Sequence, residues 1–192
     1  MELNHALQKL KEHILKTINI TEDEWSFIKS HFRLKHLKKH QFLIQEGDLV
    51  PNEFWIIKGL VKSYFTEESG KEHILQFAME EYWVSDFQAY QNKERATLSI
   101  DCLEEAYFLV MSLEDREMMC NKIPALANFF RIKSTKGYIS LQQRVMGLMR
   151  DSTEERYNNL IIKLPDLIQR VPKKYIASYL GVSRETLSRF TK

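Results

Sequence analysis

Near its end the chain reads VPKKYIASYLGVSRETLSRF (residues 171–190), two short amphipathic segments on either side of a single glycine. Ala177, Gly181 and Leu187 have the spacing that a helix-turn-helix needs. They supply a small residue where two helices cross, a glycine for a left-handed turn and an apolar residue that locks the second helix onto the first. Ser183 follows the turn as a natural N-cap. The remaining apolar positions are Ile176, Leu180, Val182 and Phe190. The stretch therefore predicts a helix-turn-helix.

The second predicted helix carries a polar face. At about 100° per residue, Arg184, Glu185, Ser188 and Arg189 fall within an arc of about 140°, whereas Leu187 points the other way. Arginine can bond bidentately to guanine and glutamate can accept from cytosine, so this face suits base edges in a major groove. The alternative is an ordinary helical hairpin with a salt-bridged surface. Because the apolar anchors and the polar face agree, we favour base reading by these four residues.

The positive charge of the chain is concentrated near the same stretch. Residues 163–192 hold seven basic and two acidic side chains, although the whole chain has a net charge of only +2. Such an asymmetry is typical of a module that binds a polyanion. Lys173 and Lys174 open the first helix, and together with Ser183 and Thr186 they are the candidates for phosphate contacts. Double-stranded DNA is the expected partner.

Before this stretch the sequence pattern changes twice. The first thirty or so residues have helical spacing, and Thr21 with Glu24 predicts a capping box. From about His40, short runs rich in aromatic and β-branched residues alternate with turn signals at 46–48, 58–59 and 68–70, which predicts an antiparallel barrel or roll. These runs are HQFLIQEGD (40–48), EFWIIKGLVKSYF (53–65), KEHILQFAME (71–80) and ATLSIDCLEEAYFLVM (96–111).

After Pro124 a long uninterrupted helix is predicted, ALANFFRIKSTKGYISLQQRVMGLMR (125–150). Its mostly apolar stripe recurs at steps of three or four residues. The stripe consists of Leu126, Phe130, Lys133, Gly137, Leu141, Val145 and Leu148. Such a helix needs a partner, which is either the roll of its own chain or its twin in a homodimer. Lys133 and Gly137 interrupt the stripe, so the spacing alone leaves both alternatives open.

Composition excludes several classes of protein. At 192 residues and 44% hydrophobic, the chain can bury one sizeable core, or a main domain with a small one. No apolar run reaches the roughly 18 residues of a membrane helix and no signal-peptide core is present, so we expect a cytoplasmic protein without a membrane partner. Cys102 and Cys120 lack metal-ligand spacing. No clustered His and Glu ligand set indicates a metal-dependent enzyme, so we expect neither catalytic residues nor a metal.

The chain resembles the Crp/Fnr superfamily of bacterial transcription regulators, which includes the cyclic-AMP receptor protein. The resemblance covers nearly the whole chain and is carried by EGD (46–48), FWIIKGLVKSY (54–64) and, most specifically, SRETLSR (183–189). It implies an α+β fold. Its parts would be a cyclic-nucleotide-binding-like β-roll sensor domain with flanking helices (1–122), a long dimerisation helix (123–150) and a winged helix-turn-helix DNA-binding domain (151–192).

The resemblance also implies roles for particular residues. Arg184, Glu185 and Arg189 match the base-reading side chains of the family's recognition helix. The long helix would pair with its twin, which favours the homodimer, through Leu126, Phe130, Leu141, Val145 and Leu148. The protein would then be a dimeric, sequence-specific transcription regulator that reads a palindromic site, with RNA polymerase as a further candidate partner.

The family's cyclic-nucleotide cassette is altered in this chain. Where members that bind cyclic nucleotide have Gly-Glu and, ten residues after that Glu, Arg followed by Ser or Thr, the segment YWVSDFQAYQNKERATLSI (82–100) has Val84-Ser85 and then Arg95-Ala96. Arg95 would neutralise a cyclic phosphate, and Asp86 replaces the ribose-binding acid only if the loop is one residue shorter. Arg95, Ser85, Asp86 and Thr97 are the candidate effector-pocket residues. Losing several charge-assisted bonds of about 1.5–3 kcal/mol each would weaken binding by orders of magnitude.

We therefore expect no cofactor, and cyclic AMP is not expected to be the natural effector. The alternative is a cyclic-nucleotide-responsive regulator whose DNA affinity is switched by a ligand at Arg95. Trp83, Phe87 and Tyr90 indicate either a flatter ligand or a pocket filled by its own side chains, and we favour the second. The family's N-terminal iron–sulfur sensor is excluded because no cysteine precedes Cys102. The histidines at positions 31, 36, 40 and 73 are expected to be solvated or hydrogen-bonded rather than bound to haem.

Overall fold

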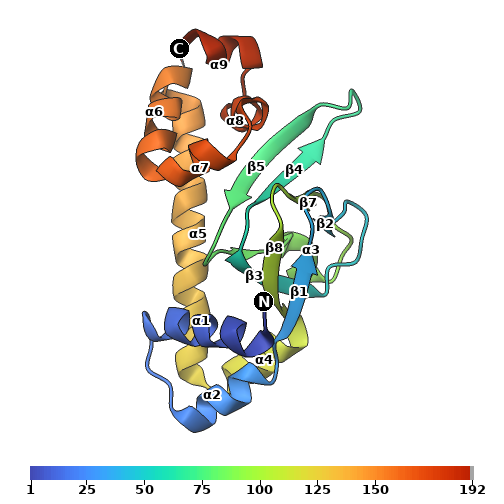
Figure 1. The fold of residues 1–192 in the computed structure, drawn as a ribbon, viewed down its shortest axis with the longest axis vertical. Helices are drawn as coiled ribbons and strands as arrows, with labels where there is room; N and C mark the ends of the chain where they lie inside the picture. The colour runs from blue at the N-terminus through green and yellow to red at the C-terminus, as the bar shows by residue number, and fades with distance from the viewer. Residues whose placement is uncertain (191–192) are drawn as a thin grey trace. The chain divides into compact units, whose positions relative to one another are not determined.

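A computed structural model of the chain describes residues 1–190, apart from the side chain of Phe190 (Figure 1). The chain divides into two units. The first unit comprises Met1–Ser63 and Phe77–Lys133, and the second comprises Tyr64–Gln76 and the residues from Ser134 onward. The division expected from the sequence, with boundaries at 122 and 150, differs from these units and stays a prediction.

The aromatic and β-branched runs form two four-stranded sheets, in the orders β1-β8-β3-β6 and β2-β7-β4-β5. Strand β8 lies antiparallel to both β1 and β3, with Leu109 opposite Leu34 and Trp55. Gly59, at one of the predicted turns, has φ +111°, and an added Cβ would lie 2.6 Å from that of Ala106, so only glycine fits there. The strands are β1 (Arg33–Leu37), β2 (Phe42–Ile44), β3 (Asn52–Lys58), β4 (Val61–Thr66), β5 (Glu72–Ala78), β6 (Trp83–Val84), β7 (Ser99–Cys102) and β8 (Ala106–Ser112).

The predicted roll is confirmed, and its interior is apolar. Side chains from both sheets join one buried cluster, in which Ile56, Ile100 and Phe108 are fully buried. Burying a side chain of this size contributes about 1.5–3 kcal/mol. Tyr90, from the short helix α3 (Phe87–Asn92), belongs to the same cluster and is 1% exposed. The aromatic cassette segment therefore fills the roll with its own side chains at this position.

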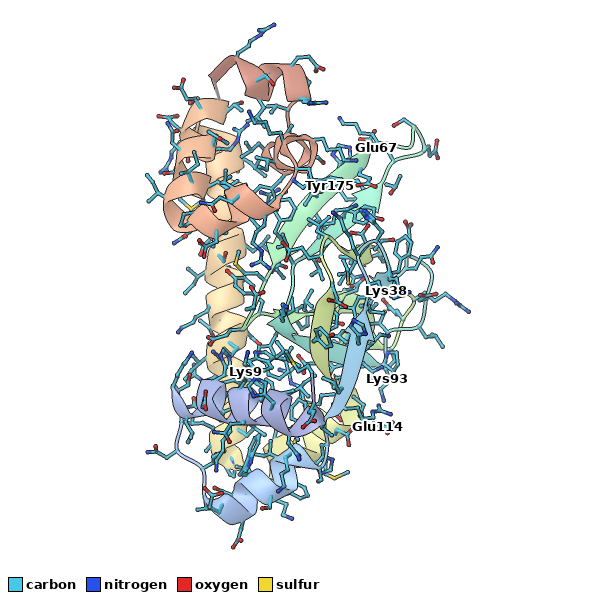
Figure 2. The ribbon with its side chains drawn as sticks, in the orientation of Figure 1. Lys9, Lys38, Glu67, Lys93, Glu114 and Tyr175 are labelled. Carbon is cyan, nitrogen blue, oxygen red and sulfur yellow. The ribbon has the colours of Figure 1, made fainter. Side chains whose placement is uncertain are left out.

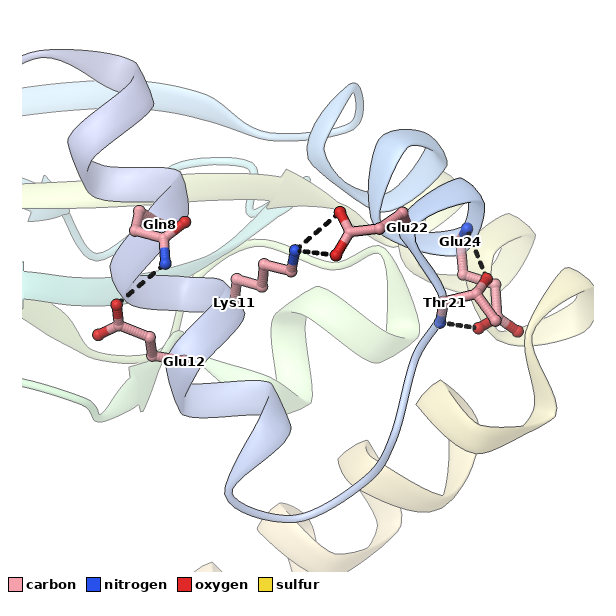
Figure 3. Close-up of polar contacts among 6 residues, drawn as sticks. All are labelled: Gln8, Lys11, Glu12, Thr21, Glu22 and Glu24. Atoms are coloured by element: carbon pink, nitrogen blue, oxygen red, sulfur yellow. Dashed lines mark hydrogen bonds and ion pairs between the residues drawn. The ribbon is translucent and has the colours of Figure 1, made fainter.

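Four helices cover the outer face of β3 and β8 in the first unit. They are α1 (Leu3–Leu15), α2 (Glu22–Lys29), α4 (Leu113–Lys122) and the start of α5 (Pro124–Arg150). Their apolar faces form a second buried cluster with Trp55 and Leu109. The capping box predicted for Thr21 and Glu24 is present, and a 2.6 Å ion pair joins Lys11 of α1 to Glu22 of α2 (Figure 3).

The long helix α5 is confirmed from Pro124 to Arg150, but the two halves of its apolar stripe differ in burial. Leu126 and Phe130 lie in the core of their own chain, where Phe130 packs edge-on against Trp83 at 5.2 Å. Leu141, Val145 and Leu148 are exposed in the described chain. The first half of the helix therefore packs against its own chain, whereas pairing of the second half with its twin stays a prediction.

The second unit contains the rest of α5 and four shorter helices, α6 (Thr153–Lys163), α7 (Pro165–Arg170), α8 (Lys173–Leu180) and α9 (Arg184–Phe190). Helix α6 begins with a capping box between Ser152 and Glu155. The strands of a wing are not found within residues 151–190. Among the described residues, no helix has both the length and the apolar character needed to cross a membrane.

Candidate nucleic-acid interface

The turn between α8 and α9 has the geometry that the sequence predicts. Gly181 ends α8 in the left-handed conformation at φ +73°. Its N–H donates to the carbonyl of Ser178 at 3.1 Å, and the N–H of Val182 donates to the carbonyl of Ala177 at 3.0 Å. This is a Schellman-type ending, which satisfies the last carbonyls of the helix. Ala177 is 2% exposed, as expected for the small residue at the helix crossing.

Helix α9 is held by one buried side and presents charge on the other. Leu187 is 1% exposed and is the anchor of this helix. Arg184, Glu185 and Arg189 are exposed. The predicted N-cap is confirmed, because the Ser183 hydroxyl accepts a hydrogen bond from the backbone N–H of Thr186 at 3.2 Å. The side chain of Phe190, the second predicted anchor, lies outside the described residues.

The polar side chains of α9 differ in the hydrogen bonds that they already make within the chain. The Ser188 hydroxyl donates to the carbonyl of Arg184 at 2.9 Å and is only partly exposed, so its two lone pairs remain as acceptors. The pKa of Glu185 is lowered by a hydrogen bond from its own backbone N–H and, secondarily, by one from the Ser183 hydroxyl. Glu185 is therefore an ionised acceptor at neutral pH. Ser183 and Thr186 bond to each other at 3.2 Å within the cap.

Lys173 and Lys174 stand at the start of α8, and both are exposed. The Nζ of Lys174 lies 4.5 Å from the ring centroid of Tyr175. The free N–H groups of a helix N-terminus attract anions, so two lysines beside them suit a phosphate group. The predicted backbone-contacting lysines are thus brought to one end of α8.

Two arginines that the sequence analysis did not single out hold the other end of α8. Arg144 of α5 donates to the carbonyl of Tyr179 at 2.8 Å and stacks on its ring at 3.5 Å. Arg156 of α6 donates to the carbonyl of Leu180 at 3.1 Å. Cations at a helix C-terminus offset its partial negative charge. These contacts fix the position from which α9 departs.

Residues Tyr64–Gln76 of the β4–β5 hairpin belong to the second unit, and strand β5 contacts both α8 and α5 there. The Ser178 hydroxyl donates to the carbonyl of Glu72 at 2.6 Å, and Arg144 donates to the carbonyl of Ile74 at 3.0 Å. Figure 2 labels Glu67 on this hairpin and Tyr175 on α8. No spacing in the sequence signals such contacts, because the residues of the Ser178 bond are 106 positions apart.

The candidate effector residues lie in the first unit and bond within the chain. Asp86 is 2% exposed and caps α3 by accepting from the N–H of Ala89 at 3.1 Å. Its other oxygen accepts from the N–H of Thr97 at 2.8 Å and from the hydroxyl of Thr97 at 3.0 Å. Asp86, the acid one residue beyond the position expected for ribose binding, therefore closes the cassette loop.

Arg95 and Ser85 are engaged in the same way. The Arg95 guanidinium is exposed and donates to the carbonyl of Gly47 at 2.8 Å. The Ser85 hydroxyl donates to the carbonyl of Asn52 at 2.9 Å. Each of the four candidates thus bonds to protein atoms, and Asp86 and Thr97 bond to each other.

The histidines considered as haem ligands mostly pair with carboxylates. His31 bonds to Asp115 at 2.9 Å and His36 to Glu105 at 2.8 Å, while His73 pairs with Glu67. Within residues 1–190, no group of three or more His, Cys, Asp or Glu side chains is placed to hold a metal ion.

Comparison with known proteins agrees with this architecture. The family model "Cyclic nucleotide-binding domain" matches residues 34–122. An anaerobic regulatory protein of Aggregatibacter actinomycetemcomitans is 26% identical, over 82% of this chain and 65% of that relative, so the chain spans slightly less than two thirds of that relative's length. The regulatory protein HlyX of Actinobacillus pleuropneumoniae is also 26% identical, over 82% of this chain and 69% of its own length.

Among solved structures, FixK2 of Bradyrhizobium japonicum has the same fold, with a TM-score of 0.71 at 14% identity over 82% of this chain and 81% of that one. The structure thus joins a cyclic-nucleotide-binding-type roll to a helix-turn-helix through the long helix α5. The chain is thus similar in sequence and in fold to regulators of the Crp/Fnr superfamily.

Proposed function

We propose that this protein is a sequence-specific DNA-binding transcription regulator that reads base edges with α9. The observation that carries the proposal is the two-sided α9, in which buried Leu187 anchors the helix while Arg184, Glu185 and Arg189 are exposed. A fixed helix with an ionised acceptor and two guanidinium donors suits direct readout in a major groove. The regulatory proteins among its relatives support the same function.

The regulator acts as a homodimer through the second half of α5. Tyr138, Leu141, Val145 and Leu148 follow one another at steps of three or four residues, and their exposed fractions run from 66% to 44%. A stripe with this period fits an identical helix in knobs-into-holes packing. Because a two-fold dimer presents two α9 helices, it would read a palindrome whose half-sites are about 34–36 Å apart.

DNA binding does not depend on cyclic AMP in this proposal. The Asp86 carboxylate is buried and already accepts three hydrogen bonds, so a ribose hydroxyl would have to displace them. The competing function is a cyclic-nucleotide-responsive switch at Arg95, which the family match over residues 34–122 favours. By linkage, an effector that raises DNA affinity must itself bind more tightly when DNA is present.

The experiment is selection of bound duplexes from a random pool at fixed salt, using the purified chain with and without cyclic AMP. Recovery of one inverted repeat under both conditions is the expected result. Recovery only with cyclic AMP would establish the nucleotide-responsive alternative. Recovery of an unrelated set of sequences, with no shared motif, would contradict sequence-specific reading by α9.

A further inference from the structure

The second unit contains a basic pocket that the proposed DNA reading does not use. The pocket is a cavity of about 430 Å³ between α5, α6 and the C-terminal end of α8. Four basic side chains line it, Arg144, Arg150, Arg156 and Lys163, with Asp151 as the acidic residue. Its volume falls within the range of about 300–1,000 Å³ that is usual for small-molecule sites.

The basic groups of this α5–α6–α8 pocket are poorly neutralised by the chain itself. Arg144 donates to two main-chain carbonyls, and Arg156 to the carbonyls of Asp151 and Leu180 and the hydroxyl of Thr153. Neither guanidinium has a carboxylate partner among the described residues. Both are only partly exposed.

The two remaining basic groups are held differently. The Lys163 Nζ bonds to the neutral side chain of Gln143 at 3.1 Å. Arg150 pairs with Asp151 at 2.9 Å, so the one carboxylate of the pocket is already neutralised by the one arginine that contacts it. Three positive charges are thus left without a carboxylate, because Arg150 and Asp151 offset each other.

The ends of α5 and α8 contribute about half a negative charge each, which reduces the excess to about two positive charges. Partly buried cations without a counterion are costly, and their cost falls when an anion enters. A phosphate monoester carries about −1.5 to −2 charges at pH 7 and offers three acceptor oxygens, which matches both the excess charge and the donors. Leu160 and Leu164, which also line the pocket, offer an apolar wall to the rest of such a molecule.

We propose that the α5–α6–α8 pocket binds a small phosphorylated metabolite. The geometry favours a small molecule over a DNA phosphate, since no residue of α9 lines the pocket and Lys173 and Lys174 lie at the opposite end of α8. Because Arg144 and Arg156 also hold the last carbonyls of α8, an occupant of the pocket contacts the groups that position the reader.

The test is calorimetric titration of the full chain in phosphate-free buffer with ribose 5-phosphate and with inorganic pyrophosphate, using ribose as the uncharged control. We expect one saturable site per chain for at least one of the two anions and none for ribose. K163Q and R150Q are the informative variants, because both side chains are exposed and their loss leaves the core intact. Each should weaken the affinity about 5- to 10-fold. R33Q, an exposed arginine of β1, is the matched control and should bind like the parent.

Three results would overturn the proposal. The first is that neither anion shows saturable binding, and the second is that K163Q and R150Q bind the anion as tightly as the parent. The third is that R33Q loses as much affinity as K163Q and R150Q, which would indicate diffuse electrostatic attraction. If neither anion binds and K163Q instead reduces the salt dependence of DNA binding by about one phosphate contact, the pocket serves DNA. A protein that fails to read DNA can still bind the anion, so this test is independent of the proposed function.

Discussion

Replacing Asp86 with alanine distinguishes a structural carboxylate from a ligand-binding one. The buried Asp86 carboxylate accepts three hydrogen bonds, from the N–H of Ala89 and from the N–H and hydroxyl of Thr97. Hydrogen bonds to a charged group contribute about 1.5–3 kcal/mol, but Thr97 is exposed and water replaces part of the loss. We therefore expect D86A to lower the free energy of unfolding by about 3 kcal/mol.

The assay is urea unfolding followed by tryptophan fluorescence, because the three tryptophans of the chain, Trp25, Trp55 and Trp83, all lie in the first unit. With an m value of about 2 kcal/mol/M, the midpoint should fall by about 1.5 M urea. S85A removes a single neutral bond to the carbonyl of Asn52 and should cost only about 1 kcal/mol. A D86A midpoint within about 0.3 M of the parent, given the same m value, would refute the structural role of Asp86.

Burial raises the pKa of Glu53 to about 6, although Arg116 and Tyr90 oppose the shift by stabilising the charged carboxylate. Because the folded state holds the proton more tightly than the unfolded state, the contribution of Glu53 to the free energy of unfolding should fall by about 2 kcal/mol as the pH rises from about 4.5 to 6. E53Q should flatten this part of the pH profile of unfolding, and an unchanged slope would contradict the assignment. L141E places a charge in the exposed stripe of α5 and should convert a dimer to monomers in sedimentation velocity, while a dimer of undiminished affinity would exclude this interface. K173A should weaken binding to all duplexes alike and reduce the salt slope by about one, and an effect confined to one sequence would mean that Lys173 reads bases.

Much of the fold follows from local patterns in the sequence. The capping box at Thr21, the left-handed Gly181 and the N-cap at Ser183 are satisfied within a few residues of themselves, so their spacing was sufficient to predict them. The roll could be predicted in the same way, because alternating apolar residues and glycine turns specify short antiparallel strands.

Features that depend on residues far away in the sequence could not be predicted from it. Periodicity places Leu126 and Phe130 in the same stripe as Leu141, yet only the first two meet Trp83 and its neighbours in the core of their own chain. The same limit applies to Arg144, whose partners lie 35 and 70 residues away. The sequence shows a charged residue at such a position but not the carbonyl groups that hold it.

The most direct test of base reading compares R184A with the parent on the selected duplex and on random DNA at the same salt concentration. Arg184 is exposed on α9, whereas Leu187 is buried, so the loss of Arg184 should remove a contact to one base without disturbing the anchor of the helix. We expect a loss of about 1–3 kcal/mol on the selected duplex, relaxed preference at one base pair of each half-site and little change on random DNA. Equal weakening on both kinds of DNA would contradict the account, because Arg184 would then contact only the phosphate backbone.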